Sequence, residues 1–448
     1  MTRKKIKNKL AKSFIIFLSV VSILCIALFT KTDTTPYKKT GYYKEMVSRL
    51  DSIPEETIKG EYFKAGWAKE NITPNNPLPI ASYGIRKNNL GVHDSLWVRT
   101  FVFDNGVNKV AMVTMDLLIF PPEVTKRLES KLPAGFSLNN TYLSATHTHN
   151  GAGGWAKGAA GIFLAGSFEE GYVQKMVEAI AKSISSASLN MEDALIGTAR
   201  FNAFYLVKNR LVNRDEVDPW LRVLKVKKAS GATAVLSTFS AHPTCISSKI
   251  DLISRDYPGA LVDSLEKSGK VEFASFMAGA VGSHAPRNYN MSNFNLIGFI
   301  GNQLSYKILS SIDTLSVFKP SIIKTLNIPL SLREPHFKVT NSIRLRPWVF
   351  EWLLGKYTFV MKALRIDNIV FVGTPCDFSG TMVDSIDEFS SAKNYQVFVT
   401  SFNGGYLGYI TEDRYYNLQK GETKDMNWFG PYNGAYFLEI IQSIIAKI

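Results

Sequence analysis

Two histidines separated by one residue are the clearest candidates for chemistry in the chain. His147 and His149 lie in the segment THTHNGAGG, directly after the apolar run NTYLSA. Residues two apart on a strand face the same side, so an extended segment would present both imidazoles together. Paired imidazoles suit metal binding or acid–base catalysis. The pattern predicts a site where a strand runs out into a glycine-rich loop.

Three other segments supply matching residue types at strand ends. His242 closes AVLSTFSAH, Asp377 follows NIVFVGTPC, and Tyr409 lies with Tyr406 in the glycine-rich FNGGYLGYIT. Ligands of α/β folds favour the carboxyl ends of strands. Plain alternatives remain open for each residue: a core histidine, a helix N-cap for Asp377 and a buried core tyrosine.

The elements that must position these residues are a mixture of strands and helices. Runs such as WVRTFVFD, KVAMVTMDLLIF and EFASFMAGA carry the β-branched and aromatic bias of buried strands. Helical spacing is found within 173–184 and 297–308, and Pro121 and Pro122 suit a helix start. We therefore predict one mixed α/β (α+β) domain over 61–448, with layered sheets covered by helices, and leave the sheet order open.

Charge and composition narrow the classes of function. The chain has 46% hydrophobic and 20% charged residues, which is typical of a globular core. Six of the charges in its net charge of +14 belong to the N-terminal residues Arg3, Lys4, Lys5, Lys7, Lys9 and Lys12, which leaves +8 for the rest. The remaining Lys and Arg are scattered among acids, without the aromatic interleaving of a nucleic-acid platform. We predict no nucleic-acid partner and no protein partner.

The uncharged run at residues 13–30 predicts a membrane helix behind the basic head. A basic flank stays cytoplasmic, so the domain should lie outside the cytoplasm, periplasmic or extracellular. The segment 1–30 is interpreted as a retained single-pass anchor, with a cleaved signal and a secreted domain as the alternative. Residues 31–60 are polar and are interpreted as a stalk.

Two further features have competing interpretations. The stretch WVFEWLLGK at 348–356 is either a core helix or a lip that dips into the membrane or receives a lipid tail. Cys245 lies three residues after His242, and Cys376 directly precedes Asp377. The two thiols are either unrelated and buried, or paired at the site as a disulfide or as a substitute metal ligand.

Together these blocks resemble the neutral, non-lysosomal ceramidases over about residues 62–448. The resemblance is carried in order by FKAGWAKENITP, GVHDSLWVRTF, VTMDL, THTHNGAGG, VDPWLRVLK, SAHPT, LISRDYPG, GAVGSHAPR, GTPCDFSG and GGYLGYIT. It implies the catalytic-domain fold of that family and hydrolysis of the N-acyl amide bond of ceramide or a related lipid. The implied partner is that lipid substrate, reached at a membrane surface.

The resemblance also implies a zinc site and roles for its neighbours. By position the Zn²⁺ ligands would be His147, His242, Asp377 and Tyr409, although two histidines with oxygen ligands also accept manganese, iron or nickel. A zinc-bound water would attack the amide carbonyl. His149 would transfer protons or stabilise the oxyanion, and Arg210 with Gly153 and Gly154 would bind substrate.

Three departures from the family pattern limit these expectations. Ala285 stands at the position of the proposed active-site serine of the family. Three alternatives follow: a zinc-bound water attacks the amide unaided, Ser283 or His284 takes over part of the role of the serine, or the protein has lost ceramidase activity. Asp377 replaces a glutamate and is one methylene shorter. The immunoglobulin-like C-terminal domain of typical members is expected to be absent. The alternatives are a hydrolase of another amide or ester, and a catalytically inactive lipid- or glycan-binding surface protein.

Overall fold

The body of the protein is built around two β-sheets that pack face to face. The computed structural model describes residues 3–82, 84–356 and 358–448. The larger sheet has the order β12 (Phe273–Ala278), β10 (Thr233–Phe239), β9 (Trp220–Lys228), β7 (Glu192–Asn202), β2 (Lys64–Asn71), β4 (Trp97–Asp104), β5 (Lys109–Met115) and β6 (Thr141–Ala145). The smaller sheet has the order β14 (Ile323–Pro329), β16 (Val360–Ile366), β17 (Ile369–Gly373) and β19 (Gln396–Thr400).

Aromatic side chains fill the space between the two sheets. Tyr142 of the larger sheet meets Phe371 of the smaller one with ring centroids 6.2 Å apart, and Phe371 stacks on Phe398 at 4.5 Å. Strands β4 and β5 are buried along almost their whole length. Such continuous apolar runs arise because both faces of the sheet are covered, one by the second sheet and one by helices.

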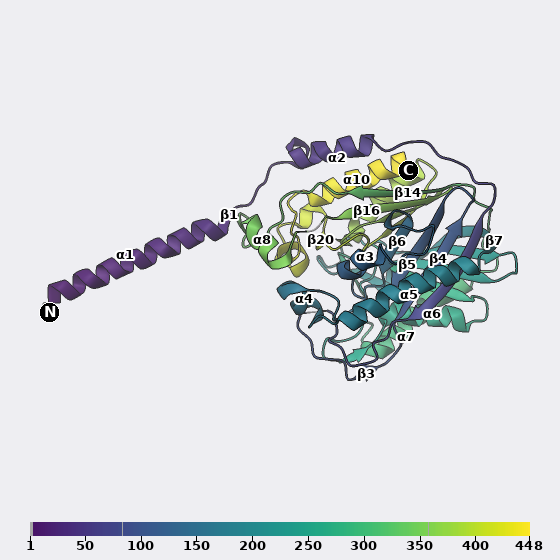
Figure 1. Ribbon diagram of the computed structural model, residues 1–448, viewed down its shortest axis with the longest axis horizontal. Helices are drawn as coiled ribbons and strands as arrows, with labels where there is room; N and C mark the ends of the chain where they lie inside the picture. The colour runs from purple at the N-terminus through teal and green to yellow at the C-terminus, as the bar shows by residue number, and fades with distance from the viewer. Residues whose placement is uncertain (1–2, 83, 357) are drawn as a thin grey trace.

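Helices cover the two outer faces, which gives four layers in the order helix, sheet, sheet, helix. The larger sheet is covered by α3 (Pro122–Leu128), α5 (Glu170–Leu189), α6 (Asp256–Lys267) and α7 (Asn293–Leu309). The smaller sheet is covered by α2 (Gly41–Asp51), α9 (Val383–Ser391) and α10 (Asn433–Lys447). Figure 1 shows α2 and α10 on the side opposite α5 and α6. The predicted mixed fold is confirmed.

The predicted helical stripes face the core as expected. Val173, Met176, Val177, Ile180 and Ile184 of α5 are all buried. Each fully buried apolar side chain of this kind contributes roughly 1.5–3 kcal/mol. The stripe of α7 at residues 297–308 is buried in the same way, and the prolines at 121 and 122 do begin α3.

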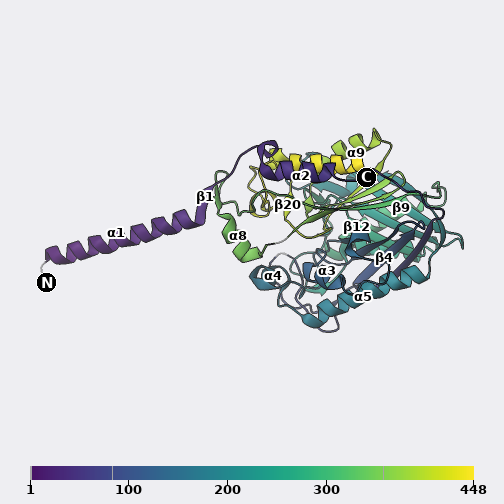
Figure 2. The same cartoon turned by 45° about the horizontal axis from the view of Figure 1, so that its top comes forward.

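The N-terminal helix α1 (Arg3–Leu28) projects away from the body (Figures 1 and 2). Among the described residues, one helix is long and apolar enough to cross a membrane, the 19-residue stretch Leu10–Leu28 with mean hydropathy 2.4. It leads directly into β1 (Phe29–Lys31), which pairs antiparallel with β15 (Ile343–Leu345) of the body.

Residues 31–60 do not form the predicted stalk. The hydroxyl of Thr40 caps α2, whose Met46 and Leu50 are buried against α10 and the smaller sheet. Arg333 forms an ion pair with Asp33, which fastens the preceding segment as well. Tyr37, Tyr42, Tyr43 and Ile53, partly buried, pack against the same apolar cluster. The segment belongs to the outer helical layer.

Short elements near one end of the sheets hold the connecting loops. They are the strand pairs β3 (Gly91–Val92) with β11 (Leu252–Ile253), β8 (Val207–Asn209) with β13 (His284–Pro286) and β18 (Asp377–Phe378) with β20 (Tyr409–Ile410), and the helices α4 (Gly158–Ala165) and α8 (Pro347–Leu354). Within α8, Val349 and Phe350 are buried, whereas Trp348 and Trp352 are exposed. One side of α8 therefore packs in the core, and its other side is exposed.

Candidate metal centre

The carboxyl ends of strands from both sheets converge on one place. Three parallel pairs set this up: β5 with β6, β10 with β12, and β17 with β19. The backbone N–H of Ser401, after β19, donates to Ala278 O at the end of β12, at the usual distance of 3.0 Å. The loops that leave β6, β10, β12, β17 and β19 therefore meet, and they carry the predicted site residues.

Three imidazoles form the middle of the site. The Nε2 atoms of His147 and His242 lie 2.8 Å apart, and those of His147 and His149 lie 3.1 Å apart. The other nitrogens are held from behind: His147 Nδ1 donates to Leu118 O at 2.5 Å, and His149 Nδ1 lies 2.9 Å from Ser82 Oγ. With its proton kept on Nδ1, His147 presents an Nε2 lone pair to its neighbours.

The two histidines of THTH converge by a route that the strand prediction missed. Strand β6 already ends at Ala145, and His147 has a left-handed φ of 64°. That conformation costs a non-glycine residue about 1–2 kcal/mol. It is held by the bond from His147 N to Leu117 O and by stacking of the ring on Phe402 at 4.0 Å. A turn, rather than a shared strand face, brings the imidazoles together.

A fully buried carboxylate completes the group. Asp377 Oδ1 lies 3.4 Å from His147 Nε2 and 3.8 Å from His242 Nδ1. Asp377 Oδ2 accepts a hydrogen bond from Tyr406 Oη at 2.8 Å, whereas Oδ1 has no hydrogen-bond partner. Burial raises the pKa of Asp377 to about 7, against the lowering effect of Arg210. Although aspartate is one methylene shorter than the glutamate of the family, the Asp377 carboxylate lies within 3.4 Å of the His147 imidazole.

This donor set fits a metal ion. Burial lowers the pKa of His147 to about 3 and also lowers those of His149 and His242, so all three rings are neutral, as metal ligands must be. The three side chains offer nitrogens that all lie within 4.8 Å of one another. Converging lone pairs and an unpartnered buried carboxylate oxygen repel unless a cation or a proton lies between them.

Tyr409 and Arg210 border the group. Tyr409 is paired with Asp377 in the β18–β20 ladder, and its ring lies parallel to that of His242 at 6.5 Å. Arg210 Nη2 donates to Tyr409 Oη at 3.0 Å and to Gly282 O at 3.1 Å. Glu422 forms an ion pair with Arg210 Nε at 3.0 Å. The guanidinium therefore faces the site with its direction fixed.

Ser283 and His284 lie beside the site with their polar atoms engaged elsewhere. Ser283 Oγ accepts from Ser379 Oγ at 2.7 Å. The ring nitrogens of His284 lie 3.4 Å from Ala280 O and 3.3 Å from Glu216 O. Ala285 sits on β13, opposite Lys208 of β8. The structure does not bring either candidate substitute for the missing serine into the imidazole group.

Gly153 and Gly154 are used by the fold. Their N–H groups donate to Pro79 O and Ala165 O, both at 2.6 Å. A Cβ at Gly153 would lie 2.1 Å from Ala165 O, so a close backbone approach requires glycine there. These contacts position the loop after His149, and the substrate-binding role of the two glycines stays a prediction.

The interpretation of the two cysteines as unrelated, buried thiols is confirmed, and the alternative that pairs them at the site is wrong. Cys245 and Cys376 are both free thiols, and they are buried in different core clusters. Neighbours along an extended chain point to opposite sides, so Cys376 enters the core where Asp377 enters the site. The metal-binding group of the described residues contains histidines and no cysteine.

Sequence reasoning left out two contributors to the site. Tyr406 was noted only as a companion of Tyr409, yet it is the residue that donates to Asp377. Glu422 comes from a short helical turn, Gly421–Asp425, and nothing in its sequence context pointed to the site. The glycine-rich sequence around Tyr406 is the one signal that could have pointed to it as a site residue.

Comparison with known proteins identifies the class of protein. The family model for neutral/alkaline non-lysosomal ceramidase, N-terminal, matches residues 63–300, which is more than half of the chain. The chain belongs to this family.

The individual relatives are distant. The neutral ceramidase of Pseudomonas aeruginosa is 28% identical over 235 residues, covering 48% of this chain and 34% of that protein. The neutral ceramidase of Mycobacterium tuberculosis is 23% identical over 210 residues, covering 42% of this chain and 33% of that protein. The matched region thus spans about a third of each relative.

A solved structure shares the fold. The crystal structure of neutral ceramidase from Pseudomonas aeruginosa superimposes with a TM-score of 0.71 at 18% identity, covering 88% of this chain and 75% of that one. The layered sheets and their covering helices are therefore the architecture of this family.

Proposed function

We propose that the protein is a zinc-dependent hydrolase that cuts the N-acyl amide bond of ceramide or a related lipid. The observation that carries the proposal is the convergence of three neutral imidazoles, two of which, His147 and His242, lie within 3.8 Å of the buried Oδ1 of Asp377. Membership of the neutral/alkaline ceramidase family supports the reaction class and the lipid substrate.

The residues that would hold the zinc are His147, His242 and Asp377, with Tyr409 at the edge. Their nitrogen and oxygen donors are ordinary zinc ligands. When bound, the ion supplies an acidified water and polarises the amide carbonyl. Leu118 O and Val281 O accept from the far nitrogens of the two histidines, an arrangement that fixes ring orientation and tautomer.

His149 is proposed as the proton-transfer group. Its Nδ1 is anchored by Ser82 Oγ, and its Nε2 faces His147 Nε2 at 3.1 Å. This ring can accept a proton from the attacking water and return it to the leaving amine, provided that it is not itself a ligand. A variant His149→Ala that keeps its zinc but loses hydrolysis would support the role, whereas loss of zinc would make His149 a ligand.

Arg210 is proposed to bind the oxygen of the substrate carbonyl. A fixed guanidinium stabilises negative charge that develops in the transition state without having to reorganise. The pairing with Glu422 and the contact with Tyr409 Oη supply that fixed orientation.

The contacts of Ser283 and His284 favour the route in which water attacks without help from a residue at the serine position. Ser283 Oγ and both nitrogens of His284 already have partners, and Ala285 has no hydroxyl. The same substitution favours the alternative of a hydrolase for another amide or an ester, since the substrate contacts of that serine are missing.

The segment 1–30 is proposed as a retained anchor that leaves the body outside the cytoplasm. The pairing of β1 with β15 supports retention, because removal of the whole segment 1–30 would take Phe29 and Thr30 out of a strand that pairs with the body. Protease added to intact cells should digest the body, and protection of the body from protease would refute this orientation.

The test is metal analysis and hydrolysis on the same preparations. Purified full chain should contain one zinc per molecule and release fatty acid from a fluorescent short-chain ceramide. His147→Ala should lose both, whereas Lys182→Ala, which changes an exposed side chain of α5 outside the centre, should keep both. Equal hydrolysis rates in wild type and His147→Ala would remove the mechanism. Stoichiometric zinc without hydrolysis of ceramide would direct the search to other amides and esters.

A further inference from the structure

Exposed apolar side chains gather on one end of the body. They come from α4, from α8 and from the loop before residue 90, and we call them the end face: Ile85, Ile162, Phe163, Trp348, Trp352 and Leu353. Trp352 is 76% exposed and Phe163 60%. The helices α4 and α8 contact each other, and a Cβ at Gly84 would touch the Phe163 ring. The end face is therefore contiguous.

The sequence of these helices does not suit an ordinary water-exposed surface. In α8, Val349 and Phe350 turn inward while Trp348 and Trp352, four residues apart, turn outward. Helix α4 (GAAGIFLA) has no charged residue at all. Contiguous exposed apolar groups of this size mark a surface that has a partner.

The end face lies beside the exit of the membrane helix. Both views place α8 and α4 at the end of the body next to α1 (Figures 1 and 2). Trp348 Nε1 donates to Ala27 O at 3.2 Å, and Arg346 Nε donates to Ile26 O at 2.9 Å. Ala27 and Ile26 belong to the candidate span Leu10–Leu28.

These bonds fix the height of the end face relative to a bilayer. A helix of 19 residues is about 28 Å long, close to the roughly 30 Å of a hydrocarbon core. Its last turn then lies at the boundary between hydrocarbon and headgroups, and so does the indole that is bonded to it. Tryptophan prefers this depth, where its apolar ring and its N–H are both accommodated.

We propose that the end face is a second membrane contact, seated in the headgroup boundary of the leaflet on the side of the body. The occupant is lipid, because a partner protein would have to fit between the face and the bilayer at the exit of α1. Lys31 at the end of β1 and Arg346, which is bonded to Ile26, lie next to the end of α1 and suit lipid phosphates. The anchor and the end face together hold the body in one orientation.

The end face is connected to the metal centre from two sides. Leu164 O of α4 accepts from Ser82 N, and Ser82 Oγ holds the ring of His149. Beyond α8, Val360 N donates to Gly404 O, in the loop that carries Tyr406. A lipid that leaves the bilayer under this face enters beside the catalytic loops, a step that rests on the proposed function.

Tryptophan quenching by brominated lipid tests the contact directly. The chain has seven tryptophans and none in residues 1–30, so the anchor itself gives no signal. We would reconstitute the full chain in vesicles of phosphatidylcholine brominated near the glycerol end of its acyl chains. Wild type should be quenched, and the double variant Trp348→Phe, Trp352→Phe should lose most of the quenching. Trp220→Phe, on β9 of the larger sheet, should be quenched like wild type.

Two results would overturn the proposal. One is quenching in the double variant that equals quenching in wild type. The other is absence of quenching in wild type, which is also the result expected if a second copy of the chain covers the end face. A separate arm compares hydrolysis of ceramide in vesicles with hydrolysis of a dispersed short-chain ceramide. Phe163→Ser with Trp352→Ser should lower the ratio of the two rates about tenfold. Failure of wild type on both substrates would refute the proposed function and leave the quenching result standing.

Discussion

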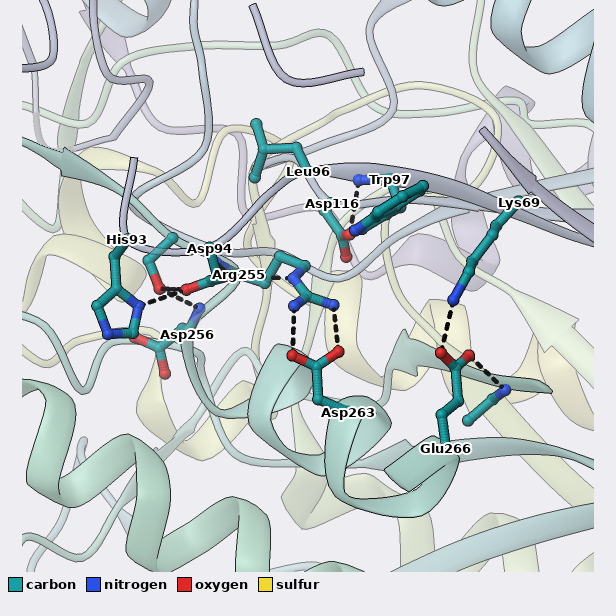
Figure 3. A network of polar contacts seen from close by, with 12 residues as sticks. Lys69, His93, Asp94, Leu96, Trp97, Asp116, Arg255, Asp256, Asp263 and Glu266 are labelled. Carbon is teal, nitrogen blue, oxygen red and sulfur yellow. Dashed lines mark hydrogen bonds and ion pairs between the residues drawn. The ribbon is translucent and has the colours of Figure 1, made fainter. Parts of the chain in front are cut away.

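Replacing Arg255 by methionine should destabilise the fold and loosen the metal centre. The guanidinium is 3% exposed. Its Nε lies 2.9 Å from Asp94 Oδ1, and its two terminal nitrogens lie 3.1 and 2.7 Å from the carboxylate oxygens of Asp263 (Figure 3). Burial lowers the pKa of Arg255, but Asp116, Asp263 and Asp94 outweigh it and keep the group charged.

The expected cost follows from what the variant leaves behind. The side chain of Asp263 is 36% exposed and returns to water, so its pairing counts for less than about 1 kcal/mol. Asp116 and Asp94 stay largely buried, and removal of the partner of a buried charge costs about 3–5 kcal/mol. Because Asp94 keeps partial solvent access and its bond from Arg255 N, we expect about 3 kcal/mol in total.

The effect should reach the histidines through a short chain of contacts. Asp94 Oδ2 accepts from Ser254 Oγ, and Ser254 O accepts from Thr148 Oγ1, both at 2.6 Å. Thr148 stands between the two histidines of THTH. Arg255→Met should therefore lower zinc retention during dialysis as well as the unfolding temperature.

A matched control is a cation that pairs with an acidic residue of the same helix. Lys69 binds Glu266 of α6 at 2.6 Å, and its side chain is 38% exposed (Figure 3). Lys69→Met should change the stability by less than about 1 kcal/mol. Thermal unfolding by circular dichroism, with zinc present and removed, should give a drop of a few degrees or more for Arg255→Met only. Equal midpoints for the two variants would refute the reasoning.

Three other changes test separate parts of the structure. Burial lowers the pKa of Lys362 from 10.5 to about 8, so between these pH values the unfolded chain binds more protons than the folded one. Raising the pH through this window should therefore stabilise wild type relative to Lys362→Met, by up to about 3 kcal/mol. Curves of unfolding free energy against pH that run parallel for the two proteins would contradict this. Gly282→Ala would place a Cβ 2.4 Å from Asp377 O and should lower both zinc content and unfolding temperature, whereas Gly298→Ala in α7, where a Cβ meets nothing, should not lower the temperature. Glu422→Gln should raise KM about tenfold with zinc content unchanged, because the guanidinium it pairs with is released; an unchanged KM would exclude that positioning role.

The sequence predicted the places of the site residues better than their geometry. His147, His242 and Asp377 follow strands whose apolar pattern is strong, and strand ends gather at one edge of a sheet. The left-handed turn at His147 was beyond prediction, because it depends on contacts with Leu117 and Phe402, which are distant in sequence. The same holds for Glu422, whose role comes only from the partner it meets.

Two misplaced expectations have local physical causes. The segment 31–60 is polar overall, and its few apolar and aromatic residues, among them Met46, Leu50 and Tyr43, are the ones that pack on the body. The cysteines adjoin two proposed ligands in sequence, but adjacency along the chain separates side chains in space when the backbone is extended. Nearest-neighbour reasoning fails at such positions, whereas the helical spacing of three or four residues predicts the buried face of α5 correctly.

The β1–β15 pairing has a consequence for how the protein searches for its substrate. Because a strand of the body begins one residue after α1, no flexible tether separates the two. With α1 as the proposed anchor, the body would not tumble freely above the bilayer, and its encounters with lipid would become a lateral, two-dimensional search with a fixed approach angle. Glycine residues inserted between Leu28 and Phe29 would let the body rotate freely. The body would then reach a larger area around the anchor, but it would no longer hold a fixed orientation to the bilayer.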